Sequence, residues 1–280
     1  MRTTGNKNCI SMKNTKLFAA LCCTAMLFAA CEKNEDKISY DPDAIAEDDL
    51  SVVTEGDLTI SGSENGHNYA DLGLSVKWAT MNVGATALEE YGDGFAWGET
   101  TTKDTYNWSN YKFAKGNYST LTKYCNDTIY GYLLEEDGKR FTDELTTIEA
   151  ADDAATANWG GKWRMPTVDE WNELISNCTL TWSTLNDKVG YEVKAANGNS
   201  IFIPVSDASN ADGKIYGYYW SSSLYTNNPS YAQYVYFHYY TKTVYDENKM
   251  EDIVYYICSH FALNNSLRYC GYAVRPVVAE

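Results

Sequence analysis

The clearest structural signal in the chain is Pro166-Thr167-Val168-Asp169-Glu170-Trp171-Asn172-Glu173-Leu174-Ile175-Ser176-Asn177-Cys178. Thr167 can cap a helix, and Glu170, three residues later, completes the pattern of a capping box. From Trp171 to Cys178, apolar residues occupy the first, fourth, fifth and eighth positions, which is the spacing of one helix face. The segment therefore predicts an amphipathic helix that starts after Thr167 and buries its apolar side.

Strand signals surround this helix. Asn197-Gly198, a dipeptide typical of tight hairpin turns, lies between the apolar-rich runs 191–195 and 200–204. Residues 152–157 are expected to form a second, short helix. Further strands are expected at residues 74–79, 218–223, 232–239 and 271–277. Short strands with one or two helices indicate an α+β fold in one compact domain.

The N-terminal segment has the layout of an export signal. An uncharged apolar run, residues 17–30, follows two lysines and ends in two alanines directly before Cys31. It resembles a bacterial lipobox, in which the cysteine is acylated, although Phe28 replaces the usual aliphatic residue. We predict a lipoprotein signal peptide at residues 1–30, lipidation of Cys31, and a lipid-anchored location at the outer membrane, exposed on the cell surface. An uncleaved anchor helix is the alternative.

The chain is strongly acidic, with a formal charge of −16. Removal of the signal, which holds four basic and no acidic residues, would change this charge to −20. Such a chain repels phosphate, so we expect no nucleic-acid partner. It also lacks a polybasic contact for the membrane, which leaves the N-terminal lipid as the only expected membrane attachment.

Composition divides the mature chain into two parts. Residues 31–66 are acidic, rich in turn residues and poor in large apolar ones, so they are predicted to form a flexible tether. The acidic stretch after Cys31 resembles the surface-export signal of Bacteroidetes lipoproteins. Residues 67–280, where tryptophan, tyrosine and glycine become frequent, are predicted to form the folded domain.

Four cysteines remain in the mature chain besides Cys31: Cys125, Cys178, Cys258 and Cys270. An exported chain can form disulfides, and four cysteines allow three pairings. We predict a Cys258–Cys270 bridge, which closes a short loop, and a Cys125–Cys178 bridge as the remaining pair. Four free, buried thiols are an equal alternative.

A series of motifs follows in order from Tyr69 to Val277. They are Tyr69-Ala70-Asp71-Leu72-Gly73-Leu74, Val76-Lys77-Trp78-Ala79-Thr80-Met81-Asn82-Val83-Gly84, Tyr91-Gly92-Asp93, Phe95-Ala96-Trp97-Gly98-Glu99, Trp163-Arg164-Met165-Pro166-Thr167, Glu170-Trp171, Tyr219-Trp220-Ser221-Ser222-Ser223 and Ala273-Val274-Arg275-Pro276-Val277. In this order they resemble the Fibrobacter succinogenes major paralogous domain, which is common in Bacteroidetes lipoproteins. The resemblance implies a C-type-lectin-like fold with short twisted antiparallel strands, one or two helices and long loops.

Most residues of these motifs are expected to be structural. Arg164 and Arg275 should use their guanidinium groups to bond backbone carbonyls. Buried tryptophan is common, so the core is expected to contain five tryptophans: Trp78, Trp97, Trp163, Trp171 and Trp220.

No spaced catalytic or metal-ligand motif is present in the sequence. The serines at 221–223 lack the surroundings of a nucleophile elbow. Asn227-Asn228-Pro229 is faintly similar to the calcium-binding loop of sugar-binding C-type lectins, but serines follow Trp220 where that family has Asn and Asp ligands. We therefore expect no enzyme activity, no metal and no cofactor.

Tyrosine is concentrated in residues 216–272, which hold 14 of the chain's 24 tyrosines. Tyrosine and asparagine together are typical of antibody paratopes, whereas tyrosine alone also fills ordinary strand positions. Because Tyr239-Tyr240 and Tyr255-Tyr256 place neighbours on opposite faces of a strand, we expect some of them to be exposed. The residues predicted to bind a ligand are Tyr225, Asn227, Asn228, Tyr231, Tyr239, Tyr255, Tyr256, His260, Asn264, Asn265, Arg268 and Tyr269.

The function expected from these features is recognition of an unknown glycan or protein at the cell surface. A structural or envelope-assembly lipoprotein with no small ligand is the alternative. The C-terminal segment also resembles the variable proteins of diversity-generating retroelements, whose adenine mutagenesis converts Asn codons into Tyr, Ser, Asp, His, Cys, Phe or Arg codons. That resemblance implies a diversified surface over residues 225–269, although ordinary divergence between paralogues could yield the same residues.

Overall fold

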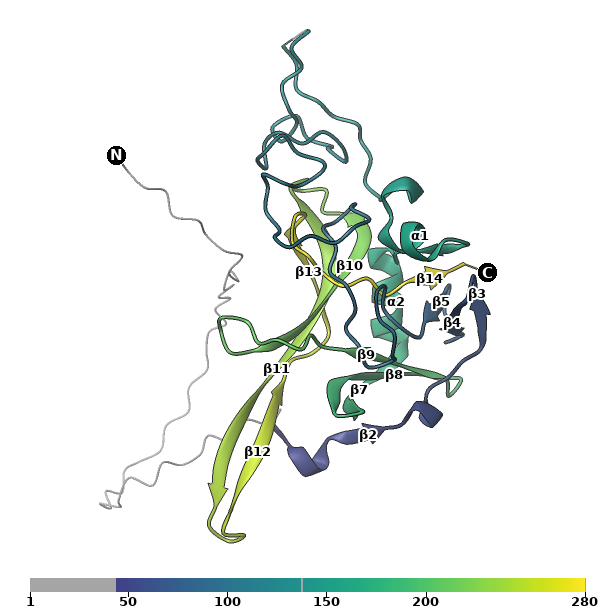
Figure 1. The fold of residues 1–280 in the computed structure, drawn as a ribbon, viewed down its shortest axis with the longest axis vertical. Coiled ribbons are helices and arrows are strands. Elements are labelled where there is room, and N and C mark those ends of the chain that lie inside the picture. Colours follow the sequence, from purple (N-terminus) through teal and green to yellow (C-terminus); the bar gives the residue numbers. More distant parts are fainter. Residues whose placement is uncertain (1–43, 137, 280) are drawn as a thin grey trace, which may run out of the picture. The chain divides into compact units, whose positions relative to one another are not determined.

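The computed structural model describes residues 44–136 and 138–279, and β-strands dominate them (Figure 1). The strands form three sheets with mostly antiparallel pairing, and the described residues contain two α-helices. The expected combination of antiparallel strands with few helices is thus confirmed at the level of secondary structure. The predicted signal peptide and Cys31 lie outside the described residues.

Sheet A contains the longest strands. It is built from β1 (Ala44–Ala46), β10 (Ile215–Leu224), β11 (Tyr231–Asp246), β12 (Glu251–Cys258) and β13 (Ala262–Leu267). Its order is β1–β12–β11–β10, and β13 pairs with the first part of β11. β11 therefore runs past β10 and continues into a hairpin with β12, as Figure 1 shows. The strands predicted at 218–223 and 232–239 are confirmed, and both extend further.

Sheet B has four strands, and its last two form the predicted hairpin. They are β2 (Ser51–Val53), β7 (Cys178–Leu185), β8 (Lys188–Ala195) and β9 (Ser200–Pro204), with β2 parallel to β7. In the turn between β8 and β9, the Gly198 N–H donates to the Ala195 carbonyl at 3.0 Å. Gly198 has φ +89°, a conformation that glycine adopts without steric cost. The Asn-Gly signal thus correctly located this hairpin.

Sheet C is made of short segments from both ends of the domain. Its order is β3 (Gly62–Glu64), β4 (His67–Ala70), β5 (Lys77–Ala79), β14 (Val277–Val278) and β6 (Trp163–Arg164). Of the strand predicted at 271–277, only Val277 lies in β14. The preceding residues make isolated bridges instead, at Tyr272 with Phe95 and at Ala273 with Tyr219.

The helices agree with the sequence signals. α1 (Ala154–Trp159) follows a 3-10 turn at Ala150–Asp152, and α2 (Val168–Asn177) follows Thr167. The Thr167 side chain accepts from the Glu170 N–H at 3.2 Å, and a Glu170 carboxylate oxygen accepts from the Thr167 N–H at 2.8 Å. Trp171 and Leu174 are fully buried. The capping box and the apolar face of α2 are therefore confirmed.

Two clusters of buried side chains lie on opposite sides of β10 and β11. Tyr219, Val235 and Phe237 belong to the first cluster, which also contains Trp171 of α2. Trp220 and Tyr234 belong to the second. Alternate residues of one strand point to opposite faces, so the same two strands supply both clusters. The five tryptophans expected in the core are all buried.

Both motif arginines were expected to bond backbone carbonyls; Arg275 does so, and Arg164 does so in part. The fully buried Arg275 donates to the carbonyls of Ala79 and Phe202 at 3.0 and 2.8 Å. Arg164 donates to the Met165 carbonyl, but its shorter bonds go to both carboxylate oxygens of Glu170. Glu170 therefore joins α2 to β6 in addition to capping the helix.

The folded domain begins earlier than the predicted boundary at residue 67. Residues 44–66, assigned to the tether, form β1, β2, β3 and two 3-10 turns, at Glu47–Asp49 and Glu55–Asp57. β1 pairs with β12, and β2 pairs with β7. Leu50 and Val53 are buried. A few apolar residues in an acidic segment were enough to attach it to two sheet edges.

The predicted disulfides are not present. Cys125, Cys178, Cys258 and Cys270 are not joined by disulfides in the described residues. Cys258 packs against the first core cluster, whereas Cys270 belongs to the second, so the short sequence separation of this pair does not bring the thiols together. Burial raises the pKa of the Cys258 thiol to about 12 and that of Cys178 to about 11, which keeps both protonated near neutral pH.

Candidate functional site

The most distinctive surface is one face of sheet A, on which aromatic side chains face each other across β10 and β11. The directly opposed pairs are Tyr216 with His238, Tyr218 with Tyr236, and Trp220 with Tyr234. These six residues point away from the first core cluster, because the residues that alternate with them belong to it. We call this set, together with Tyr272, the outer aromatic face.

Part of the outer aromatic face is accessible to solvent. Trp220 and Tyr234 are buried in the second core cluster. Tyr218, Tyr236, His238 and Tyr272 are only half-buried. Tyr216, at the other end of the face, is buried as well, so the accessible part consists of Tyr218, Tyr236, His238 and Tyr272.

The rings of this face hold one another in fixed orientations. Tyr218 lies between Tyr216 and Tyr272, with ring centroids 4.8 and 4.7 Å away and interplanar angles of 7° and 16°. Tyr272 also contacts Trp220, at a centroid distance of 4.6 Å. Rings locked in this way lose little side-chain entropy when a ligand covers them.

The tyrosine hydroxyl groups are also held in place. Tyr216 Oη donates to Asp212 Oδ2 at 2.7 Å, and Asn210 Nδ2 donates to Tyr218 Oη at 3.3 Å. Burial, and then the hydrogen bond and charge of Asp212, raise the pKa of Tyr216, so its phenol stays protonated. The face thus presents neutral, oriented hydroxyl groups beside apolar rings.

His238 is the one imidazole on this face. Its ring centroid lies 4.8 Å from that of Tyr216, and within the described part of the chain its buried Nδ1 has no hydrogen-bond partner. Burial lowers the pKa of His238 to about 4; Lys214 adds to this effect and Asp212 opposes it. His238 is therefore neutral at physiological pH.

The same face continues along the β11–β12 hairpin. Tyr240, 37% exposed, and Lys242 follow on β11, and Tyr255 of β12 lies opposite Lys242. Lys214 Nζ lies 5.9 Å from the centroid of the Tyr240 ring. The prediction that neighbouring tyrosines point to opposite faces is confirmed here, because Tyr239 and Tyr256 pack against the first core cluster instead.

The residues predicted to bind a ligand are spread along the whole of β11. One group lies near its start: Tyr225, Asn227 and Asn228 in the β10–β11 turn, Tyr231 at the first position of β11, Asn264 and Asn265 in β13, and Tyr269 after it. A second group, Tyr239, Tyr255 and Tyr256, lies on the hairpin, and His260 lies between β12 and β13. At a rise of about 3.3 Å per residue, Tyr231 and Tyr239 alone are separated by roughly 26 Å. They do not form one small site.

The predicted residues differ widely in exposure. Asn227, Asn264 and His260 are exposed, and the others except Arg268 are half-buried. Asn264 lies opposite Tyr234 and therefore borders the outer aromatic face.

Arg268 was wrongly assigned to the ligand-binding set. Its side chain is fully buried, with the guanidinium 4.8 Å from the centroid of the Trp97 ring. It donates to Tyr111 Oη and to the carbonyls of Tyr124, Pro229 and Lys123 at 2.8 to 3.1 Å. An arginine has five N–H donors and can join several loop segments. Arg268 therefore has a structural role, which neither its residue type nor its place in the tyrosine-rich segment indicated.

A pocket lies on the other side of β11, and Tyr239 forms part of its wall. The pocket has a volume of about 200 Å³ and is lined by residues of β8, the segment after β9, β10 and β11. Its position places one predicted residue, Tyr239, at a concave site rather than on the outer aromatic face.

No helix in residues 44–136 and 138–279 is long and apolar enough to cross a membrane. Within the same ranges, no group of three or more His, Cys, Asp or Glu side chains could hold a metal ion.

Comparison with known proteins identifies no relative: no family model, no curated protein and no solved structure matches the chain.

Sequence reasoning missed most of the outer aromatic face. Tyr216, Tyr218, Tyr236, His238 and Tyr272 were not singled out, although the tyrosine-rich region contains them. A period of two in residues 216–220 and 234–240 would have placed these rings on one face.

Proposed function

We propose that the chain is a cell-surface lipoprotein with a C-type-lectin-like domain that recognises a glycan or a protein. The observation that carries this proposal is the outer aromatic face, where stacked rings and anchored hydroxyl groups are partly accessible on sheet A. Exposed aromatic side chains favour association, and tyrosine combines contact area with hydrogen bonding at low entropic cost.

Three features support the finer parts of this proposal. The ordered motifs from Tyr69 to Val277 resemble the Fibrobacter succinogenes major paralogous domain, for which a C-type-lectin-like fold is expected. The largely antiparallel sheets and the few helices are compatible with that fold. The lipobox-like sequence around Cys31 supports a lipid anchor at the outer membrane.

The ligand should cover the half-exposed end of the outer aromatic face, around Tyr218, Tyr236 and His238. Neutral hydroxyl groups and an uncharged imidazole favour hydrogen bonding over ion pairing there. The strong negative charge of the whole chain disfavours acidic ligands. Neutral glycans and uncharged or basic protein surfaces are therefore the ligand classes that suit this face.

The test is binding of the purified chain to arrays of glycans and of surface proteins, with wild type compared with Tyr236→Ala. We expect the variant to lose most of the binding, because Tyr236 contributes a half-exposed ring to the face. Tyr245→Ala is the matched control. Tyr245 is a 55% exposed tyrosine of the same strand, and its side chain points to the opposite face of β11. Equal binding by wild type and Tyr236→Ala would contradict the assignment of the ligand to this face. Binding to neither array would favour the structural alternative.

A further inference from the structure

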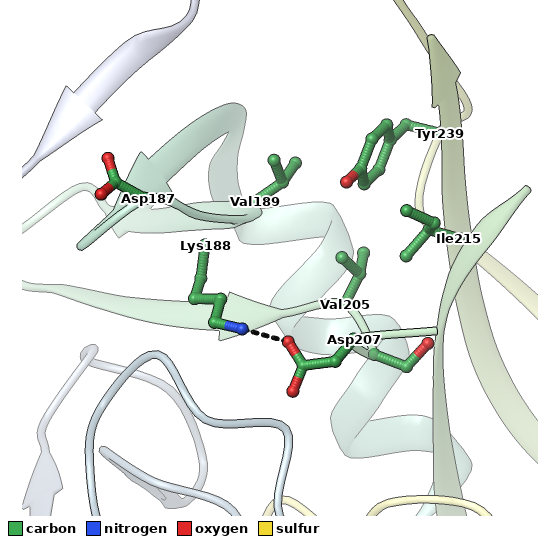
Figure 2. A pocket seen from close by; sticks show the side chains of 8 residues that line it. Asp187, Lys188, Val189, Val205, Asp207, Ile215 and Tyr239 are labelled. Atoms are coloured by element: carbon green, nitrogen blue, oxygen red, sulfur yellow. Dashed lines mark hydrogen bonds and ion pairs between the residues drawn. The ribbon is translucent and has the colours of Figure 1, made fainter. Parts of the chain in front are cut away.

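The pocket behind β11 is formed by four separate segments (Figure 2). Its wall consists of Asp187, Lys188 and Val189 at the β7–β8 turn, Val205, Ser206 and Asp207 after β9, Ile215 of β10 and Tyr239 of β11. None of these residues belongs to the outer aromatic face. The pocket is therefore a feature separate from that face.

The pocket has an apolar side and a polar side. Val189, Val205, Ile215 and the ring of Tyr239 lie together on one side in Figure 2. Val189 and Val205 are buried, and Tyr239 packs its ring 5.3 Å from that of Tyr256. Small-ligand sites combine such an apolar wall with a few placed polar groups.

The polar side contains an ion pair. Lys188 Nζ contacts Asp207 Oδ1, and the carboxylate of Asp187 adds a second acid to the wall. The hydrogen bond from Lys188 to Asp207 is the largest influence on the pKa of Lys188 and raises it. Desolvation lowers this pKa, and the negative charges of Asp207, Glu89 and Glu90 raise it, so the net shift is upward. The lysine is thus already engaged, and the surroundings of the pocket are acidic.

Size and charge restrict the ligand. A cavity of about 200 Å³ is smaller than the roughly 300–1,000 Å³ of pockets that hold drug-sized ligands, so it suits a molecule of one ring. The excess of carboxylates disfavours an anionic ring such as a uronic acid. The carboxylates and the ammonium offer acceptors and donors to ring hydroxyl groups, while the aromatic and aliphatic wall can cover a C–H face.

We propose that this pocket binds a single neutral pyranose unit of a glycan. The C–H face of the ring packs on Tyr239, Val205 and Ile215, and its hydroxyl groups bond to Asp207, Lys188 and Asp187. This site goes beyond the proposed function, because it lies on the opposite side of β11 and shares no residue with the outer aromatic face.

The test is titration of the ¹³C-labelled methyl groups of Val189, Val205 and Ile215 with the methyl pyranosides of glucose, galactose and mannose. We expect at least one of them to shift these signals saturably, with a Kd of about 1–10 mM. Asp207→Asn should weaken binding at least about fivefold, since it removes the lysine partner and an acceptor charge. Asp252→Asn, a change at an exposed acid on the hairpin, should leave the Kd unchanged.

Two outcomes would overturn the proposal. One is the absence of saturable shifts with all three glycosides in a wild type whose spectrum is that of a folded protein. The other is tighter binding of n-butylammonium than of any glycoside, which would identify the pocket as a site for a cationic side chain. Tyr236→Ala is expected to retain pyranose binding, so failure of the outer aromatic face and failure of the pocket can be distinguished.

Discussion

Arg268 joins segments that are far apart in the sequence. Its guanidinium reaches carbonyls at residues 123, 124 and 229 and packs on Trp97, so one side chain fixes the β10–β11 turn against the loop that follows Phe113. Between Ala79 and Ala150 the described residues form no helix or named strand. Side-chain bonds of this kind therefore add to the turn and bridge hydrogen bonds of the backbone that hold these loops.

Substitution of Arg268 should reveal how much this cluster contributes to stability. We expect Arg268→Lys to lower the free energy of unfolding by at least about 2 kcal/mol, because a buried acceptor left without its donor costs roughly 1–3 kcal/mol. Arg140→Lys is the matched control, since Arg140 also donates to three carbonyls but is exposed. Urea denaturation of both variants measures the difference. Similar losses in the two would show that burial is not what makes Arg268 important.

His238 should make stability depend on pH. Its folded-state pKa of about 4 lies below the ordinary value of 6.5, so the unfolded chain binds a proton first as the pH falls. The His238 contribution is thus complete above pH 6.5 and is lost progressively toward pH 4. We expect wild type to lose more thermal stability over this window than His238→Gln. His67, whose pKa is also lowered, is present in both proteins and cancels in the comparison. Parallel melting curves across the window would contradict this prediction.

At the scale of elements, α2 is where local signals and packing agree. Trp171 is fully buried and its ring lies 4.6 Å from Trp78 and 5.9 Å from Tyr219. We expect Trp171→Ala to cost roughly 3–5 kcal/mol, as other large core truncations do. Thr167→Ala removes only a cap and should cost about 1 kcal/mol. Equal denaturation midpoints for the two variants would show that the helix is not anchored by its apolar face.

Elements with a short-range signal could be predicted from the sequence, and the others could not. The capping box before Val168 and the Asn-Gly turn depend on neighbouring residues only, so α2 and the β8–β9 hairpin were placed correctly. β1 and β2 have three residues each and exist because distant strand edges accept them. β14 is short because the residues before it bridge Phe95 and strand β10 instead. No local pattern encodes those long-range partners.

The candidate site shows the same limit at the scale of the whole chain. Composition located the tyrosine-rich region but did not separate the two faces of β11. Tyr239 and Tyr240 are neighbours, yet one lines the pocket and the other continues the outer aromatic face. Arg268 resembled a surface residue by type, and only the folded structure reveals its buried partners. Pairing register, which depends on contacts across the sheet, determines which residues can meet a ligand.

The segment before the predicted domain boundary should be needed for the stability of the whole domain. β1 covers the edge of β12, and β2 covers the edge of β7, while Leu50 and Val53 are buried. Burial of one such side chain contributes about 1.5–3 kcal/mol. We therefore expect a chain that starts at His67 to melt well below one that starts at Ala44, and to aggregate more readily through its uncovered strand edges.

Two single variants of the full chain separate this effect from a general effect of truncation. Val53→Ala should lower the free energy of unfolding by about 1–2 kcal/mol, because Val53 is 5% exposed and its γ-methyl groups would leave a gap. Val52→Ala removes the same atoms from the adjacent residue, which is 77% exposed, and should change the stability little. If the two variants and both shortened chains melted alike, residues 44–66 would act as a tether after all. If only Val53→Ala and the chain that starts at His67 are destabilised, the segment that contains β1 and β2 is an integral part of the fold.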